Sequence, residues 1–122
     1  MIETDFRFEL INNGAVTAII GSRLFLRDPI RPQTSSYAIY YRQVKNRDMV
    51  SEKNRFQITA FSKDTLELEN LCQAIINALE GKKVLNSNAY YSNSLLGQTD
   101  SRIKLDDGFF WSILTFEFKQ SI

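Results

Sequence analysis

The chain has 122 residues, so we expect a single domain over residues 1–122. Hydrophobic residues make up 43% and aromatic residues 12% of it, enough for a packed core, which argues against a disordered chain. The 15 Lys and Arg are balanced by 14 Asp and Glu, whereas a dedicated nucleic-acid binder needs a basic excess or stripe. There is no histidine, which removes His-based acid–base catalysis, His-containing metal sites and Ser/His or Cys/His nucleophiles. We therefore expect neither an enzyme nor a protein that holds a metal or cofactor.

The acidic N-terminus lacks the basic start and apolar run of a secretory signal. The longest apolar stretch, Ala15 to Ile20, is far shorter than the ~20 residues that span a bilayer. We expect a soluble, intracellular protein with no membrane contact. The single cysteine permits no intrachain disulfide.

Residues 4–20 show helical spacing. The polar start, Thr4-Asp5, can accept hydrogen bonds from the free N–H groups of the first turn, which predicts an N-cap there. One apolar face is formed by Phe6, Leu10 and Ile11. Residues 13–14 (Asn-Gly) predict a break, and a short second helical piece over residues 15–20 ends at Gly21.

Three predicted strands follow, the last two joined by a hairpin. Arg23 to Leu26 is a short apolar strand, and the two prolines in Asp28 to Pro32 predict an extended surface loop. Tyr37 to Val44 is rich in aromatic residues, with Tyr37, Ile39 and Tyr41 on one face and Ala38, Tyr40 and Arg42 on the other. Polar residues from Lys45 to Asn54 predict the hairpin tip. The returning strand, Arg55 to Phe61, directs Phe56, Ile58 and Ala60 inward.

The strongest helical signals lie between Asp64 and Glu80. Asp64 and Glu67 have the spacing of a capping box, in which two orphan N–H groups are satisfied. One face carries Leu68, Leu71, Cys72, Ile75 and Leu79. Gly81 predicts a left-handed end to the helix, and Lys82-Lys83 suit the negative end of its dipole.

The last third of the chain is rich in turn residues. Val84-Leu85 and Ala89-Tyr90-Tyr91 are interpreted as short strands, and Ser101 to Leu105 alternates like a strand. Asp106-Asp107-Gly108 is typical of a hairpin turn. Phe109 to Phe118 is a long final strand, with Phe110, Leu114, Phe116 and Phe118 on one face and Trp111, Ile113 and Thr115 on the other. Because both faces are apolar near its start, we expect a central strand, or one that a partner covers.

The order of these elements is α-β-β-β-α-β-β. This order is typical of helices packed on a mainly antiparallel sheet. The predicted fold is α+β, with a mainly antiparallel sheet of four to five strands and two helices packed on one face.

Two places in the sequence have residues that suit a catalytic or metal site. Cys72 has a nucleophilic thiol, but there is no histidine to activate it, and its position on an apolar helix face favours a small buried core residue. Asp106-Asp107 has the composition of a paired-carboxylate metal site. Adjacent residues in a turn point apart, however, and turn formation alone explains them.

Two surfaces have a possible binding role. The aromatic residues of the strands suit either stacking on bases or a core with a protein interface, and the second interpretation is favoured; they are Tyr37, Tyr40, Tyr41, Tyr90, Tyr91, Phe109, Phe110 and Trp111. The densest basic cluster suits phosphate, an acidic partner or plain solvation; it comprises Arg42, Lys45, Arg47, Lys53 and Arg55.

The order of segments resembles the tail-completion proteins of long-tailed bacteriophages (siphophages), also called tail-terminator or tail-to-head joining proteins. The matching pieces cover roughly residues 5–118: Ala15-Val16-Thr17-Ala18-Ile19-Ile20-Gly21-Ser22-Arg23-Leu24-Phe25 with its Gly-x-Arg-apolar turn, the proline loop Asp28 to Pro32, the strand Tyr37 to Val44, the strand Arg55-Phe56-Gln57-Ile58-Thr59-Ala60-Phe61-Ser62, the helix Leu66 to Leu79, and the closing strand Phe109 to Phe118. The family offers no catalytic residues to carry over.

The resemblance implies a structural role in virion assembly. Its members form a homo-hexameric ring on the tail, sometimes from monomers in solution, that caps the tail tube and offers a surface to the head-completion (connector) protein. The implied partners are therefore the tail tube protein, the connector protein and further copies of the chain, with DNA passing through the ring without sequence-specific binding. The implied location is the virion at the head–tail interface, and the host cytoplasm during assembly.

Two other functions stay open at this point. One is a small nucleic-acid-binding module that uses the basic hairpin and the aromatic strands. The other is a non-catalytic subunit of a bacterial complex.

Within the assembly interpretation, we expect partner binding at the hairpin tip, through Arg47, Met49, Val50 and Lys53. The core does not need this segment, and charges of both signs suit a specific, salt-sensitive contact. Met49-Val50 would be an exposed apolar pair that gains by insertion into a partner.

Overall fold

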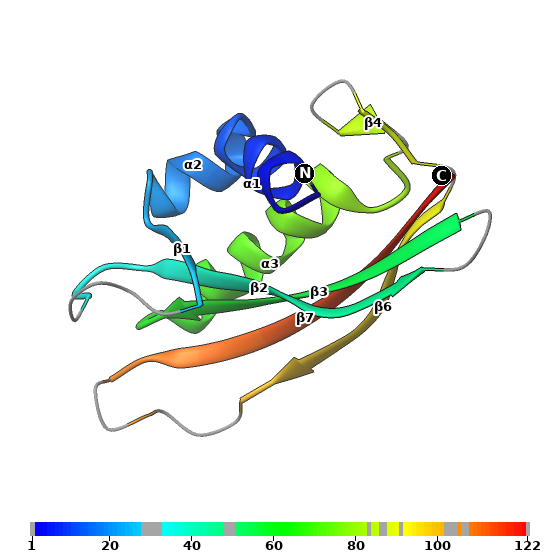
Figure 1. Ribbon diagram of the computed structural model, residues 1–122. Coiled ribbons are helices and arrows are strands. Elements are labelled where there is room, and N and C mark those ends of the chain that lie inside the picture. Colours follow the sequence, from blue (N-terminus) through cyan, green and yellow to red (C-terminus); the bar gives the residue numbers. More distant parts are fainter. Residues whose placement is uncertain are drawn as a thin grey trace.

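Three helices cover one face of a twisted sheet in the computed structural model of the chain (Figure 1). The structure describes residues 2–27, 33–47, 51–82, 84–85, 88–90, 92–101, 105 and 108–121. The helices are α1 (Ile2–Ile11), α2 (Gly14–Ile20) and α3 (Thr65–Leu79). The strands are β1 (Leu24–Leu26), β2 (Tyr37–Arg47), β3 (Ser51–Ser62), β4 (Val84–Leu85), β5 (Asn88–Ala89), β6 (Ser92–Asp100) and β7 (Phe110–Ser121).

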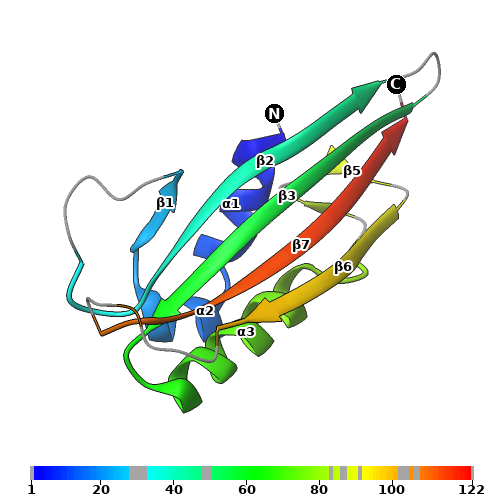
Figure 2. The same ribbon diagram turned by 90° about the horizontal axis from the view of Figure 1, so that it is seen from below.

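The main sheet has five strands in the order β1-β2-β3-β7-β6, and β4 and β5 form a separate two-stranded sheet. All neighbours in the main sheet are antiparallel except β1 and β2, which are parallel. The predicted α+β class with a mainly antiparallel sheet is confirmed, as is the central position of the final strand. Figure 2 shows the sheet from its other side, with all three helices behind it. Three helices lie there rather than two, because the break at residues 12–13 divides the first helix.

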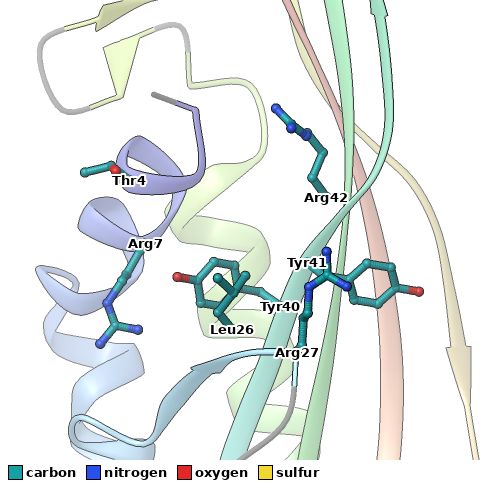
Figure 3. A pocket seen from close by; sticks show the side chains of 7 residues that line it. All are labelled: Thr4, Arg7, Leu26, Arg27, Tyr40, Tyr41 and Arg42. Carbon is teal, nitrogen blue, oxygen red and sulfur yellow. The ribbon is translucent and has the colours of Figure 1, made fainter.

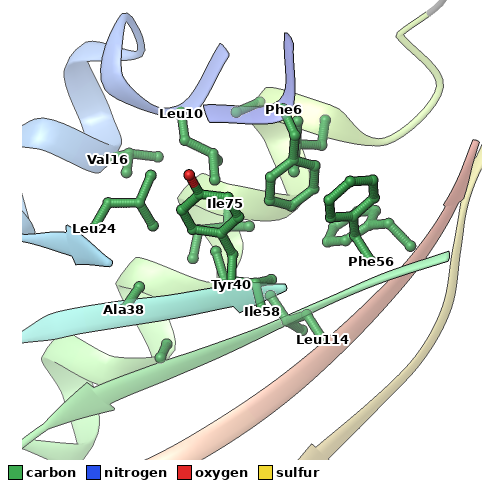
Figure 4. Close-up of a cluster of buried hydrophobic side chains, with 14 of the residues drawn as sticks. Phe6, Leu10, Val16, Leu24, Ala38, Tyr40, Phe56, Ile58, Ile75 and Leu114 are labelled. Atoms are coloured by element: carbon green, nitrogen blue, oxygen red, sulfur yellow. The ribbon is translucent and has the colours of Figure 1, made fainter. Parts of the chain in front are cut away.

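The core lies between the helices and the sheet face that they cover. Every member of the predicted α3 face is buried, and so are the predicted inward residues of β3, Phe56, Ile58 and Ala60. Helix α1 contributes Phe6, whose ring stacks on that of Phe56 with centroids 4.7 Å apart and planes 12° apart. Figure 4 shows Ile75 of α3 among the side chains that come up from the strands. The helical and strand periodicities thus identified the buried faces correctly.

The start of α1 differs from the prediction. The helix begins at Ile2, so Asp5 lies inside it rather than at its cap. Asp5 is 2% exposed, and its carboxylate accepts hydrogen bonds from Asn88 Nδ2 at 3.0 Å and from Tyr90 Oη at 2.8 Å. Burial of a carboxylate requires such donors, and these come from residues more than 80 positions away. The acid therefore ties α1 to the β5 segment.

The junction between α2 and β1 is built around Arg23. Asn13 caps α2 by accepting from the N–H groups of Ala15 and Val16, and Gly21 ends the helix with φ +57°. The Arg23 guanidinium then donates to the carbonyls of Ile19 at 3.1 Å and Ser36 at 2.8 Å. The Gly-x-Arg turn is therefore a structural joint, because it satisfies a carbonyl in the last turn of α2 and fixes the entry into β2.

The N-terminus of α3 is capped in a different way from the one predicted. Asp64 is the N-cap and accepts from the Leu66 N–H at 3.0 Å, as expected. Glu67 does not complete a capping box: its carboxylate accepts from the hydroxyls of Ser36 and Ser62. The Asp64 N–H donates to Ser62 Oγ at 3.2 Å instead. The helix end is thus satisfied by a side chain of β3, and Glu67 binds two buried serines. At the other end Gly81 has φ +74°, as predicted.

The strands of the hairpin are longer than predicted. β2 continues to Arg47 and β3 starts at Ser51, so most of the expected tip (residues 45–54) is paired strand. Polar residues can pair there because the backbone supplies the hydrogen bonds, and β3 pairs over Ser51 to Asn54 with β7 as well as with β2.

Strand β6, residues 92–100, replaces what the sequence presented as turns. It lies at the edge of the sheet, where a strand tolerates polar residues on both faces. A turn follows where one was predicted: the Gly108 N–H donates to the Leu105 carbonyl at 2.9 Å and Gly108 has φ +89°. Asp106 and Asp107, the loop Asp28 to Pro32, and Lys83, Tyr91 and Ile103 lie outside the described residues.

Candidate assembly surfaces

The predicted hairpin site is only partly covered by the structure. Arg47 is the last residue of β2 and pairs with Glu52, while Met49 and Val50 lie outside the described residues. Lys53 is half-buried on β3, where it pairs with Asn46 on one side and with Lys119 on the other. Arg47 and Lys53 thus belong to the same end of the hairpin.

The basic cluster of the sequence is partly neutralised. Arg55 forms an ion pair with Glu117 of β7, with 3.2 Å between Nη2 and Oε2. Lys119 Nζ lies 3.8 Å from the other oxygen of the same carboxylate. Since Glu117 is only 13% exposed, this acid holds two cations on the sheet face that faces away from the helices. Arg42 lies apart from this group, next to α1 and β1.

Of the two candidate chemical sites, Cys72 lies within the described residues and Asp106-Asp107 lies outside them. Cys72 is 2% exposed, as predicted for a core residue, and its burial raises the pKa of the thiol, against a weaker opposing effect of the Ser112 hydroxyl. Within the described parts of the chain no group of three or more Cys, Asp or Glu side chains is placed to hold a metal ion. None of the helices in those parts is both long and apolar enough to cross a membrane.

The aromatic residues are divided between the two faces of the sheet. Tyr40 and Tyr90 are buried on the helix side. On the opposite side Tyr37 stacks on Phe61, with centroids 4.5 Å apart, and meets Phe109 edge-on at 5.3 Å. Two of the eight named aromatic residues, Tyr41 and Trp111, are described, half-buried and on this side. They lie on β2 and β7, with β3 between them. Tyr37, Phe61 and Trp111 nevertheless lie side by side across three strands of this face, because Phe61 pairs with the other two in the sheet.

The sheet face away from the helices, called the open face below, carries an apolar area on which none of the described helices lies (Figure 1). Its half-buried members come from four strands: Phe25, Ile39, Phe61, Trp111 and Ile113. Contiguous apolar side chains without a covering layer are typical of a protein–protein contact. The sequence anticipated this surface in the second apolar face of the final strand.

A second feature is an arginine pocket of about 480 Å³ at the β1 edge of the sheet (Figure 3). It is lined by Thr4 and Arg7 of α1, Leu26 and Arg27 at the end of β1, and Tyr40, Tyr41 and Arg42 of β2. Arg7 is held in place because its Nη1 donates to the Leu24 carbonyl at 2.6 Å. Arg27 is exposed and has φ +70°, a strained value for a residue with a side chain. The described lining holds three arginines and no carboxylate.

A third feature lies at the opposite edge. A cleft of about 250 Å³ separates the first turns of α3 from the ends of β6 and β7, and its charged lining residues are Glu69 and Asp100. Asp100 is exposed, and it accepts from Ser112 Oγ at 2.5 Å and from Gln98 Nε2 at 3.0 Å. We call this the carboxylate cleft.

Sequence reasoning did not find either hollow. Each is built from residues that are far apart in the chain and that have no shared motif. Of the three pocket arginines, only Arg42 had been placed in a binding cluster, and that cluster is divided in the structure. The remaining signal, a non-glycine residue with positive φ at Arg27, exists only in three dimensions.

Comparisons with known proteins give the fold. No protein-family model matches the chain, and no curated protein matches it. Among solved structures, the chain is similar to a chain of the "Virion of native gene transfer agent (GTA) particle", with a TM-score of 0.79 and 14% sequence identity. The likeness covers 99% of this chain and 95% of that one, so the two share one architecture over nearly their whole length.

Proposed function

We propose that this chain is a structural, non-enzymatic component of a phage-like virion. The observation that carries the proposal is the near-complete likeness of its fold to a chain of a gene transfer agent virion. The segment order in the sequence supports the same class. So do the missing histidines and the buried position of Cys72, since neither leaves a nucleophile–base pair for catalysis.

Within that class the proposed role is that of a tail-completion protein. Copies of the chain form a hexameric ring that caps the tail tube and joins it to the head connector. This role requires one surface for the neighbouring copy and others for the tube and the connector. The uncovered apolar area of the open face and the charged hollows at the two sheet edges are available for such contacts.

The proposed contact with the neighbouring ring is the hairpin end, with Arg47, Met49, Val50 and Lys53. In Figure 2 the paired ends of β2 and β3 run past α1, away from the helices. This end of the sheet is not a free ribbon, because β3 pairs there with β7 as well as with β2, but its charges of both signs suit a salt-sensitive contact.

The test is negative-stain microscopy of particles made in cells that lack this protein. We expect filled heads separated from tails, and tails of uneven, excessive length. Normal joined particles would contradict the tail-completion role. Particles blocked before tails form would move the chain to an earlier step of assembly and leave only the structural class.

A further inference from the structure

The two charged hollows lie at opposite edges of the same sheet and on its helix side. The arginine pocket adjoins β1 and β2, and the carboxylate cleft adjoins β6. Pairing across the sheet shows that they are also level with each other. Tyr40 pairs with Ile58, Ile58 with Leu114 and Leu114 with Gln98, so one row of residues runs from the pocket to the cleft.

The backbone at both edges is open to a further strand. β6 is the last strand of the sheet order. Its nine residues contain neither lysine nor proline, which commonly protect an edge, although its register shifts between Leu95 and Gly97. At the other edge β1 pairs only with residues Ala38 to Tyr40 of β2. From Tyr41 to Arg47 no described strand lies on that side of β2.

The strand directions permit continuation from one copy to the next. β2 and β7 run one way, and β3 and β6 the other. A second copy in the same orientation, placed beside β2, therefore presents its β6 antiparallel to β2. Antiparallel pairing is also what joins each neighbouring pair in the order β2, β3, β7 and β6 within one chain.

We propose that successive copies of this chain bind head to tail through these edges, with Glu69 and Asp100 of one copy at the arginine pocket of the next. The partner is a second copy because the two oppositely charged hollows overlap in level on the two edges of one molecule: Tyr40 and Gln98 share a row, and Asp100 lies in the row of Ala38. Such a heterologous contact closes into a ring when the rotation allows it. The inference deepens the proposed ring and rests on that part of the proposed function.

A nucleic-acid phosphate is the competing occupant of the arginine pocket. The chain has a net charge of +1 and carries carboxylates at the corresponding place on the other edge, so a strand of DNA that followed the molecule would meet repulsion there. The carboxylates of a second copy meet only the arginines of the pocket, so their binding involves no such repulsion. The experiment below distinguishes the two occupants.

The test is chemical crosslinking of two variants, Leu26→Cys and Gln98→Cys, with a short bismaleimide. Both side chains are exposed, each lines one of the two hollows, and neither carries a charge. An arginine–carboxylate contact holds the two backbones further apart than a disulfide permits, which is why a crosslinker is used. The native Cys72 is buried, and wild-type protein, which carries no other cysteine, shows how much crosslinking Cys72 gives by itself. The matched control pair is Ala18→Cys with Gln73→Cys, both exposed on helices away from the sheet.

We expect the mixture of Leu26→Cys and Gln98→Cys to give at least five times the dimer of the control pair. A single chain with both substitutions should give a ladder of oligomers. Added Glu69→Lys should lower the yield several-fold, whereas Glu80→Lys, the same charge change at the far end of α3, should not. The yield should also fall in ~1 M salt, where the Debye length shrinks to about 3 Å.

A yield equal to that of the control pair would overturn the edge-to-edge contact. If light scattering of the wild-type protein then still showed rings, the proposed ring would stand with another interface. If instead a labelled single-stranded oligonucleotide bound the wild type and not Arg27→Gly, the pocket would be a nucleic-acid site. If crosslinking occurred as predicted but the protein were missing from virions, the contact between copies would stand and the proposed virion role would be rejected.

Discussion

The packing of α3 on the sheet predicts a large loss of stability for Ile75→Ala. Ile75 is fully buried, and it lies among core side chains that include Tyr40, Ile58 and Leu114 (Figure 4). The substitution removes three carbon atoms, worth about 2.4 kcal/mol at ~0.8 kcal/mol for each buried methylene. The cavity that remains adds a further term, so we expect a total of about 3–4 kcal/mol, within the range of measured core truncations.

The measurement is urea unfolding followed by far-UV circular dichroism. The slope of the free energy against urea should be unchanged, because the surface exposed on unfolding hardly differs. The matched control is Leu66→Ala on the same helix, where Leu66 is 63% exposed and the expected change is within ~0.5 kcal/mol. A loss below ~1 kcal/mol for Ile75→Ala, or one equal to that of the control, would refute the assigned packing of α3.

Three further predictions follow from particular contacts. Asp5→Ala removes the hydrogen-bond acceptor of Asn88 and Tyr90 and should lower the free energy of unfolding by about 2–4 kcal/mol, since hydrogen bonds to charged groups are worth ~1.5–3 kcal/mol. A change below ~0.5 kcal/mol in thermal unfolding would contradict this. Cys72 should react with a soluble thiol reagent only on unfolding, and fast labelling of the native protein would show that the site is open. Because burial raises the pKa of the Cys72 thiol, the folded state should lose stability as the pH rises through the ordinary thiol pKa. The triple variant Arg47→Ser, Met49→Ser and Lys53→Ser should keep the wild-type melting temperature but fail to restore head–tail joining; full rescue would move the connector contact elsewhere, first to residues 86–98.

The elements that were predictable from the sequence are those whose side chains repeat with the period of their own backbone. The buried face of α3 and the inward residues of β3 are examples, because burial by a single neighbouring layer leaves a simple pattern. A local cap was also predictable where the cap and its partner are neighbours in the chain, as at Asp64.

The features that were missed depend on contacts between distant residues. β6 has a polar sequence because its outer edge faces solvent, so its pattern does not differ from that of a loop. Asp5 and Glu67 were read as helix-end acids, and their actual donors come from β3 and from the segments before β2 and after α3. The arginine pocket could not be predicted for the same reason: α1, β1 and β2 each supply one of its cations.

The central claim is that this chain is a structural protein of a phage-like virion, placed where the tail meets the head. Cryo-electron microscopy of virus-like particles purified from cells that make this chain tests this most directly. We expect a ring of copies at the head–tail junction, each with the five-stranded sheet described above. Junction density that other virion proteins fill completely, with this chain nowhere in the particle, would contradict the account.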